Sequence, residues 1–231
     1  MQKYTQGGSF SKYLQENIVT ISDGTVNGDV YGSYTETGTA TGNTVTISGG
    51  TVYKNVYGGY AKNSKGTAVE NTVTISGGTI ENVYGGGNDT TFSGAGVVTG
   101  NKVTISDGTV NHDVGGGLAS SKDATENTVT ISGGTVKGNV YGSKSKDGSA
   151  TGNTVNLIGF GGTLEDAVTN NPNKPSIAGT VYGGYSDNGT VSGNQLNVYG
   201  TGTKAGNIAN FDTMNFFAPA SATESMLSAT D

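Results

Sequence analysis

The acidic residues and the single histidine are the groups of this chain that could support catalysis. His112 is the only histidine, and a histidine general base needs a nucleophile and an orienting acid beside it. It stands where other copies of a repeated motif carry Gly28, Lys54 or Gly138. Because this place accepts glycine and lysine equally, we interpret His112 as an exposed corner residue and not as a general base.

Two pairs of aspartates recur in the motif ISDGTVN-x-DV and raise the question of glycoside hydrolysis. Asp23 and Asp29 belong to one copy, and Asp107 and Asp113 belong to another, three copies further on. If the copies stack as coils about 4.8 Å apart, about 14 Å separates the pairs, which exceeds the carboxylate spacing of glycosidases. We predict turn chemistry for each pair. A polysaccharide-active enzyme is the less favoured alternative, and we expect no enzyme activity, cofactor or metal site.

Threonines repeat at positions that suggest a flat binding surface. They alternate with apolar residues in Thr-x-Thr pairs, and such arrays are typical of ice-binding solenoids. Threonine is also a good exposed strand residue, and Ile18, Lys102 and Asn156 interrupt the rows. Ice binding is therefore an alternative interpretation. The pairs are Thr44 and Thr46, Thr72 and Thr74, and Thr128 and Thr130.

Tyrosines recur beside a core valine and form the other candidate binding surface. A column of tyrosines can stack sugars or hold a partner, but it can also stabilise itself by ring stacking. We favour self-stacking, with ligand binding as the alternative. Gly115 takes the tyrosine position in the fourth copy and interrupts the column, whose members are Tyr31, Tyr57, Tyr84, Tyr141 and Tyr182.

A repeated unit positions all of these residues. The stretch NTVTISGGTVYKNVYGGY, from Asn43 to Tyr60, returns as NTVTISGGTIENVYGG from Asn71 and as NTVTISGGTVKGNVYG from Asn127. Successive asparagines are 26, 28, 30, 26, 26 and 41 residues apart, which is typical of a solenoid. We predict a ladder of asparagines at a bend, hydrogen-bonded from coil to coil and tolerant of left-handed backbone angles. Its members are Asn17, Asn43, Asn71, Asn101, Asn127, Asn153 and Asn194.

Apolar residues in each unit define short strands. Those two and four positions after the asparagine alternate with polar residues and predict a first strand with one face inward. A valine or isoleucine nine positions after it begins a second strand, and an apolar residue three positions before it marks a third. Glycine pairs after Ser48, Ser76 and Ser132 predict a corner that needs positive φ. The pairs after Tyr57 and Tyr84 predict a further corner, followed by loops of variable length.

The fold class that follows is all-β. We predict a parallel β-solenoid, a right-handed β-helix of about seven coils with roughly three short strands each. Glycine stands at 41 and proline at 3, without a Gly-X-Y period, and hydrophobic residues make up 32% of the chain, which fits repeated shallow burial. We expect one domain over residues 1–231, with a partial coil in 1–16, regular repeats in 17–193 and an atypical C-terminal coil in 194–231. Large side chains there, Phe211, Phe216 and Phe217, are expected to cover the core.

Charge and hydropathy exclude several classes of partner. The net charge is −6 without basic runs, so nucleic acid and anionic membrane surfaces are poor partners. No stretch of about 18 apolar residues predicts a membrane span. Cysteine is absent, which excludes a disulfide framework and thiolate chemistry. The start MQKYTQGGSF lacks the apolar core of a signal peptide, so we expect a segment of a longer exported protein.

The repeat also resembles a known family. The unit N-x-V-x-I-S-G-G-x-V-x-x-x-V-Y-G-G, from about Leu14 to Phe217, is similar to repeats in the passenger regions of large bacterial surface proteins, especially type V autotransporter adhesins. The segment IANFDTMNF resembles segments that follow such arrays. The resemblance implies export, display on the bacterial cell surface and a role in virulence, and it transfers no catalytic residues.

From this resemblance we expect a structural stalk of a cell-surface adhesin, monomeric as a segment. Ligand binding should lie where the units vary and not in the repeated frame. The expected partner is a host-cell protein or a glycan, held by the loops Ala61–Val69, Asn88–Val97 and Leu164–Ser176.

Overall fold

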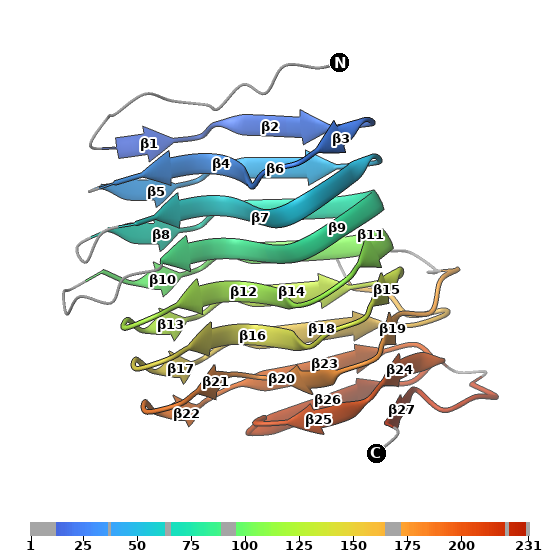
Figure 1. Cartoon of the computed structure of the whole chain (residues 1–231). Coiled ribbons are helices and arrows are strands. Elements are labelled where there is room, and N and C mark those ends of the chain that lie inside the picture. The colour runs from blue at the N-terminus through green and yellow to red at the C-terminus, as the bar shows by residue number, and fades with distance from the viewer. Residues whose placement is uncertain are drawn as a thin grey trace.

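The computed structural model describes residues 13–36, 38–62, 66–88, 96–164, 172–219 and 222–229, with side chains from residue 15 onward. These residues contain strands and no helix, and every pairing between named strands is parallel. The chain winds into coils that stack along one axis, with the first strands at one end and the last at the other (Figure 1). The prediction of an all-β parallel solenoid is confirmed.

One face of the solenoid is a narrow seven-stranded sheet to which each coil contributes one strand. This sheet carries the apolar residue three positions before each asparagine, and Ala40, Ala68 and Val98 are fully buried in it. Its strands, in spatial order, are β1 (Tyr13–Gln15), β5 (Thr39–Thr41), β8 (Thr67–Val69), β10 (Val98–Thr99), β13 (Ala124–Thr125), β17 (Ala150–Thr151) and β22 (Val191–Ser192).

The strand that follows the asparagine forms a second face. Its inward residues stack in register, as Val45 does on Val73 and Ile47 on Ile75, and all four are fully buried. The strands are β2 (Ile18–Ile21), β6 (Thr44–Ile47), the first part of β9 (Thr72–Asn88), the first part of β11 (Lys102–Val110), β14 (Thr128–Ile131), β18 (Thr154–Ile158), β23 (Gln195–Tyr199) and β26 (Thr213–Phe217).

The rest of each coil closes the third side. Short strands follow the glycine corner: β3 (Thr25–Val26), β15 (Thr135–Val136), β19 (Ser176–Ile177), β24 (Thr203–Ala205) and β27 (Leu227–Ala229). The return strands are β4 (Val30–Thr35), β12 (Val114–Ala119), β16 (Val140–Ser145), β20 (Thr180–Tyr182), β21 (Tyr185–Ser186) and β25 (Asn207–Ala209). In the second coil the short corner strand and the return strand form one strand, β7 (Thr51–Ala61). In the third coil β9 likewise contains both of them.

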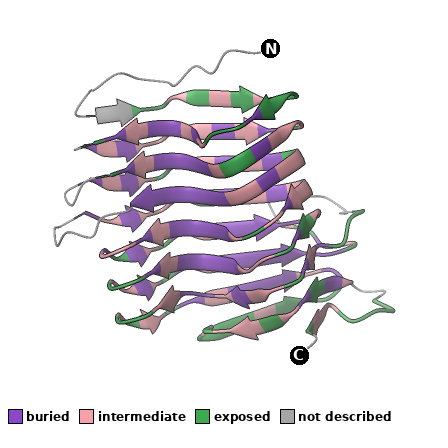
Figure 2. Cartoon of the chain, in the orientation of Figure 1, coloured by how far each residue is buried: buried purple, intermediate pink, exposed green. Residues whose placement is uncertain are grey.

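The core is one continuous column of valines and isoleucines. Buried residues concentrate in the middle coils, while exposed residues gather at the two ends and at the corners (Figure 2). At the C-terminal end Phe211 packs against this column as expected. Phe216 and Phe217 stay 53% and 50% exposed. Of the three phenylalanines, Phe211 therefore contributes most to covering the last coil.

The corner after Ser48, Ser76 and Ser132 forms as the sequence predicts. The second glycine of each pair has positive φ, at 80° for Gly50 and 87° for Gly78. At the asparagine bend the left-handed residue is the one before the asparagine. It is glycine in some coils, such as Gly42 at 66°, and glutamate in others, such as Glu70 at 55°. This corrects the expectation that the asparagine itself takes the left-handed angle.

The glycine pair after Tyr57 has a different role from the predicted one. Gly58 and Gly59 lie inside strand β7, and neither has a positive φ. A Cβ on Gly58 would lie 2.4 Å from Gly85 O and 2.9 Å from Asn71 Cβ, and a Cβ on Gly59 would lie 2.6 Å from Asn71 Cγ. The prediction of a corner here is wrong. The pair is glycine because the ladder asparagine and, at Gly58, the Gly85 carbonyl of the next coil occupy the space next to it.

Candidate functional site

The predicted asparagines lie one above another inside the solenoid. Each donates its backbone N–H and its Nδ2 to Oδ1 of the asparagine in the next coil, as Asn43 Nδ2 does to Asn71 at 2.7 Å and Asn71 Nδ2 to Asn101 at 2.9 Å. The series ends where the Asn194 backbone N–H donates to Asp212 Oδ2 at 3.0 Å. From Asn43 to Asn194 these side chains are fully buried, so the ladder holds the frame and is closed to ligands.

A second ladder, which the sequence interpretation missed, runs along the return strands. It consists of Asp29, Asn55, Asn82, Asp113 and Asn139. Asp29 Oδ1 accepts from Asn55 N and Nδ2 at 3.0 and 2.9 Å, and Asp113 Oδ1 accepts from Asn139 N at 2.9 Å. Each member directly precedes the last core valine of its coil. That recurrence of Asp or Asn was the available signal.

Asp23, Asp107 and His112 make contacts that do not form a catalytic site. Asp23 Oδ1 accepts from Gly24 N and Asp107 Oδ1 from Gly108 N, both at 2.7 Å, which is the turn chemistry that was predicted. The same prediction is wrong for Asp29 and Asp113, which bond between coils in the second ladder. The side chain of His112 is 63% exposed, and its Nδ1 lies 2.8 Å from Glu81 Oε1. Within the described ranges no three His, Cys, Asp or Glu residues gather in a metal-binding arrangement.

The predicted tyrosines form a stacked column on the outside of the return strands, which we call the first tyrosine file. Ring centroids lie 5.4 Å apart for Tyr31 and Tyr57 and 5.3 Å apart for Tyr57 and Tyr84. After the interruption at Gly115, Tyr141 and Tyr182 stack at 5.1 Å with rings 5° from parallel. Burial raises the pKa of Tyr57, and burial with the Asp29 charge raises that of Tyr31 to about 12.

A second tyrosine file, formed by Tyr34, Tyr60 and Tyr185, was not predicted. Tyr34 and Tyr60 stack at 5.6 Å, and Tyr60 meets Tyr57 of the first file edge-on at 4.9 Å. Tyr185 packs edge-on against the first file too, 5.5 Å from Tyr182. Rings stacked in this way cover one another's faces. A sugar that binds an aromatic side chain needs an open ring face, so the files fit a structural role better than a sugar platform.

The outward threonines are aligned more regularly than the sequence suggested. Strand register places Thr20, Thr46, Thr74, Thr104 and Thr130 in one uninterrupted row, which Asn156 ends. Past the corner, a second uninterrupted row is formed by Thr25, Thr51, Thr79, Thr109 and Thr135. The interruptions by Ile18 and Lys102 fall in the row beside the first one.

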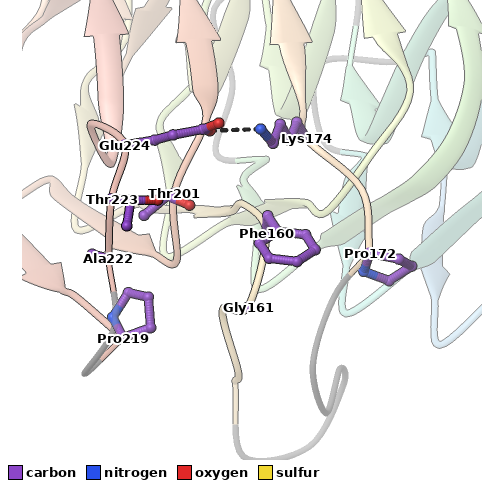
Figure 3. A pocket seen from close by; sticks show the side chains of 9 residues that line it. All are labelled: Phe160, Gly161, Pro172, Lys174, Thr201, Pro219, Ala222, Thr223 and Glu224. Atoms are coloured by element: carbon purple, nitrogen blue, oxygen red, sulfur yellow. Dashed lines mark hydrogen bonds and ion pairs between the residues drawn. The ribbon is translucent and has the colours of Figure 1, made fainter.

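A pocket lies where two excursions of the chain meet beside the last coils (Figure 3). One excursion follows β18 and the other follows β26. The cavity has a volume of about 600 Å³. We call it the loop pocket, and it is lined by Phe160, Gly161, Pro172, Lys174, Thr201, Pro219, Ala222, Thr223 and Glu224.

Backbone and side-chain contacts fix the walls of the loop pocket. Phe160 N donates to Thr201 O at 2.7 Å, and Thr201 N donates to Phe160 O at 3.0 Å. Lys174 Nζ lies 2.5 Å from Glu224 Oε2, which joins the two excursions. A Cβ at Gly202 would lie 2.6 Å from Lys174 Cδ, so the lysine stem lies across that glycine.

The loop pocket borders one of the three loops expected to bind ligands. Leu164–Ser176 leads into it through Pro172 and Lys174. The middle of this loop, residues 165–171, lies outside the described residues, as do 63–65 of Ala61–Val69 and 89–95 of Asn88–Val97. The pocket was not predicted, because it needs residues about fifty positions apart to meet.

Comparison of the chain with protein-family models, with curated proteins and with solved structures finds no match. A search of the described residues for a long apolar helix that could cross a bilayer finds none.

Proposed function

We propose that this chain is a stalk and display segment of a bacterial cell-surface adhesin, exported and monomeric as a segment. The observation that carries the proposal is constant register despite variable coil length. The step from Asn153 to Asn194 is 41 residues, yet Val155 still pairs with Leu196 and the asparagine bond is kept at 2.9 Å. The insertion therefore leaves the pairing of the flanking coils unchanged.

A frame of this kind suits display. Parallel coils rise about 4.8 Å each, so seven coils form a rod of about 30 Å whose length does not depend on the loops. Two hydrogen-bonded ladders and a continuous core hold the rod, while the coils differ in length at the variable loops. Host-cell or glycan ligands would bind these loops. The proposal includes no catalytic step.

The test is adhesion with and without the loops. Beads coated with the chain should adhere to host cells or to a glycan surface, and replacing residues 63–65, 89–95 and 165–171 together by short Gly-Ser turns should abolish adhesion. A separate replacement, at the short corner around Gly148, is the matched control. Circular dichroism should show unchanged strand content in each variant. Adhesion that survives replacement of all three loops would overturn this proposal.

The row of Thr20, Thr46, Thr74 and Thr104, which are exposed or partly exposed, favours ice binding as a second candidate, while Thr130, which continues the row, is buried. Threonines two residues apart along a strand and one coil apart between strands form a regular outward grid. A thermal-hysteresis measurement separates the candidates. Ice shaping that Thr74→Tyr abolishes and that Lys54→Tyr, at an exposed position, leaves intact would establish ice binding and overturn the adhesin proposal.

A further inference from the structure

The loop pocket combines a cavity with an exposed aromatic side chain at its edge. Phe160 is 51% exposed, and two backbone hydrogen bonds to Thr201 hold its position. Its ring lies below Lys174 and on the side of Pro172 in the close-up (Figure 3). The tyrosine files stack ring on ring, whereas Phe160 stands at the edge of a cavity. The pocket volume of about 600 Å³ lies in the range of small-molecule sites.

The polar side of the loop pocket carries one cation and one anion that neutralise each other. Lys174 Nζ lies 2.5 Å from Glu224 Oε2 and 6.0 Å from the centroid of the Phe160 ring. An ammonium group has three N–H donors and a carboxylate has two acceptor oxygens. The pair can therefore give and accept further hydrogen bonds without attracting a charged ligand. The Thr223 hydroxyl, also at the pocket wall, adds a group that both donates and accepts.

A pyranose ring matches this combination. One face of the ring carries axial C–H groups and is apolar, so it can lie on the Phe160 ring. Its edge carries hydroxyls, each of which donates and accepts, and these can reach the Lys174–Glu224 pair and Thr223. A carboxylate ligand would compete with Glu224 for Lys174, and an amine would compete with Lys174 for Glu224. A neutral sugar competes with neither Glu224 nor Lys174 for its partner in the ion pair.

We infer that the loop pocket binds one neutral pyranose unit of a glycan, with Phe160 under the ring and Lys174 and Glu224 at its hydroxyls. This inference rests on the proposed adhesin function and names the ligand class for one of its loops.

The test uses simple sugars as probes and a matched pair of phenylalanine variants. Saturation-transfer NMR is recorded on the whole chain with the methyl glycosides of glucose, galactose, mannose and N-acetylglucosamine, and the affinity of any responder is measured by calorimetry. Phe160→Ala should weaken binding about tenfold, because the apolar ring face loses its contact. Phe217→Ala is the control, since Phe217 is 50% exposed and stacks on Tyr199 at 4.5 Å outside the pocket. It should leave the affinity unchanged.

Two further variants test the polar side and the aromatic side of the pocket. Glu224→Gln keeps an acceptor oxygen and should weaken binding only a few-fold. Phe160→Trp keeps an aromatic face and should retain binding. Failure of all four glycosides to bind overturns the inference, as does equal weakening by Phe160→Ala and Phe217→Ala. The inference is also overturned if the pocket binds only a uronate and loses that binding in Lys174→Met. It is overturned as well if the pocket binds only a proline-rich peptide.

Failure here and failure of the proposed function give different results. If Phe160→Ala leaves bead adhesion intact and no glycoside binds, the pocket inference is overturned and the adhesin proposal stands. If the loop replacements also leave adhesion intact, both the pocket inference and the adhesin proposal are overturned.

Discussion

Asn71 occupies the space that a side chain on Gly59 would need: its Cγ lies 2.6 Å from the place of a Cβ on that glycine. The asparagine ladder and the glycines of the return strands are thus two parts of one packing arrangement. The amide is fully buried and donates to Asn101 Oδ1 at 2.9 Å. It cannot move aside without breaking that bond.

Gly59→Ala should therefore destabilise the solenoid. Even one methyl group overpacks this site, and such changes cost about 2 kcal/mol. Gly28→Ala is the matched control, because nothing lies within 4 Å of a Cβ there and its φ is not positive. Urea unfolding followed by circular dichroism measures both. Equal stability of the two variants would contradict the packing role of Gly59.

The sequence predicted the parts of the fold that local pattern controls. Alternation placed Val45 and Ile47 inward, and the serine-glycine-glycine motif placed positive φ at Gly50, because strand faces and tight corners depend on neighbouring residues. The prediction from sequence was wrong at Gly58 and Gly59, because a glycine pair inside a strand has the same sequence as a glycine pair at a corner. The difference lies in Asn71, twelve residues after Gly59, which folds back against them.

The missed features share a different cause, which is contact between coils. The second tyrosine file depends on strand register, which places Tyr34 beside Tyr60. The second ladder needs Asp29 to lie next to Asn55. The loop pocket requires the excursion that carries Lys174 to meet the one that carries Glu224. Repeat spacing predicts stacking for residues in the frame, and it says nothing of insertions.

The middle of the asparagine ladder should matter more than its end. Asn101→Ala removes the oxygen that accepts from Asn71 N and Nδ2 at 3.0 and 2.9 Å, and these buried donors then have no acceptor there. We expect a loss of about 3 kcal/mol. Asn17→Ala, at the partly buried first rung, should cost about 1 kcal/mol or less. The comparison of urea midpoints checks this order, and the reverse order would contradict a cooperative ladder.

Glu70→Gly should stabilise the chain, unlike most substitutions to glycine. Glu70 has a φ of 55°, which is unfavourable for a residue with a Cβ by about 1–2 kcal/mol, and the equivalent residue in other coils is Gly42 or Gly100. Glycine relieves this strain, although folding then costs more conformational entropy. We therefore expect the free energy of unfolding to rise by about 0.5 kcal/mol. Lys102→Gly, at an exposed strand position without positive φ, should lower stability. A loss of stability in Glu70→Gly would show that its side chain contributes more than its strain.

The first tyrosine file should make the solenoid sensitive to alkaline pH. Burial, with a contribution from the Asp113 charge, raises the pKa of Tyr141 to about 12, and burial with the Asp29 charge raises that of Tyr31 to about 12. An unfolded tyrosine ionises near pH 10. Above that pH the unfolded chain loses protons that the folded chain keeps, so stability is full below about pH 10 and falls as pH rises toward about 12.

Thermal melting at pH 8 and pH 11 should show this loss. Tyr141→Phe keeps the stacked ring and removes the ionisable hydroxyl, so the difference in melting temperature between the two pH values should shrink. Tyr53→Phe, at a residue 61% exposed, is the control and should leave the difference as it is in the unmodified chain. If Tyr141→Phe and Tyr53→Phe gave the same alkaline loss, ionisation of the buried file would not be its cause.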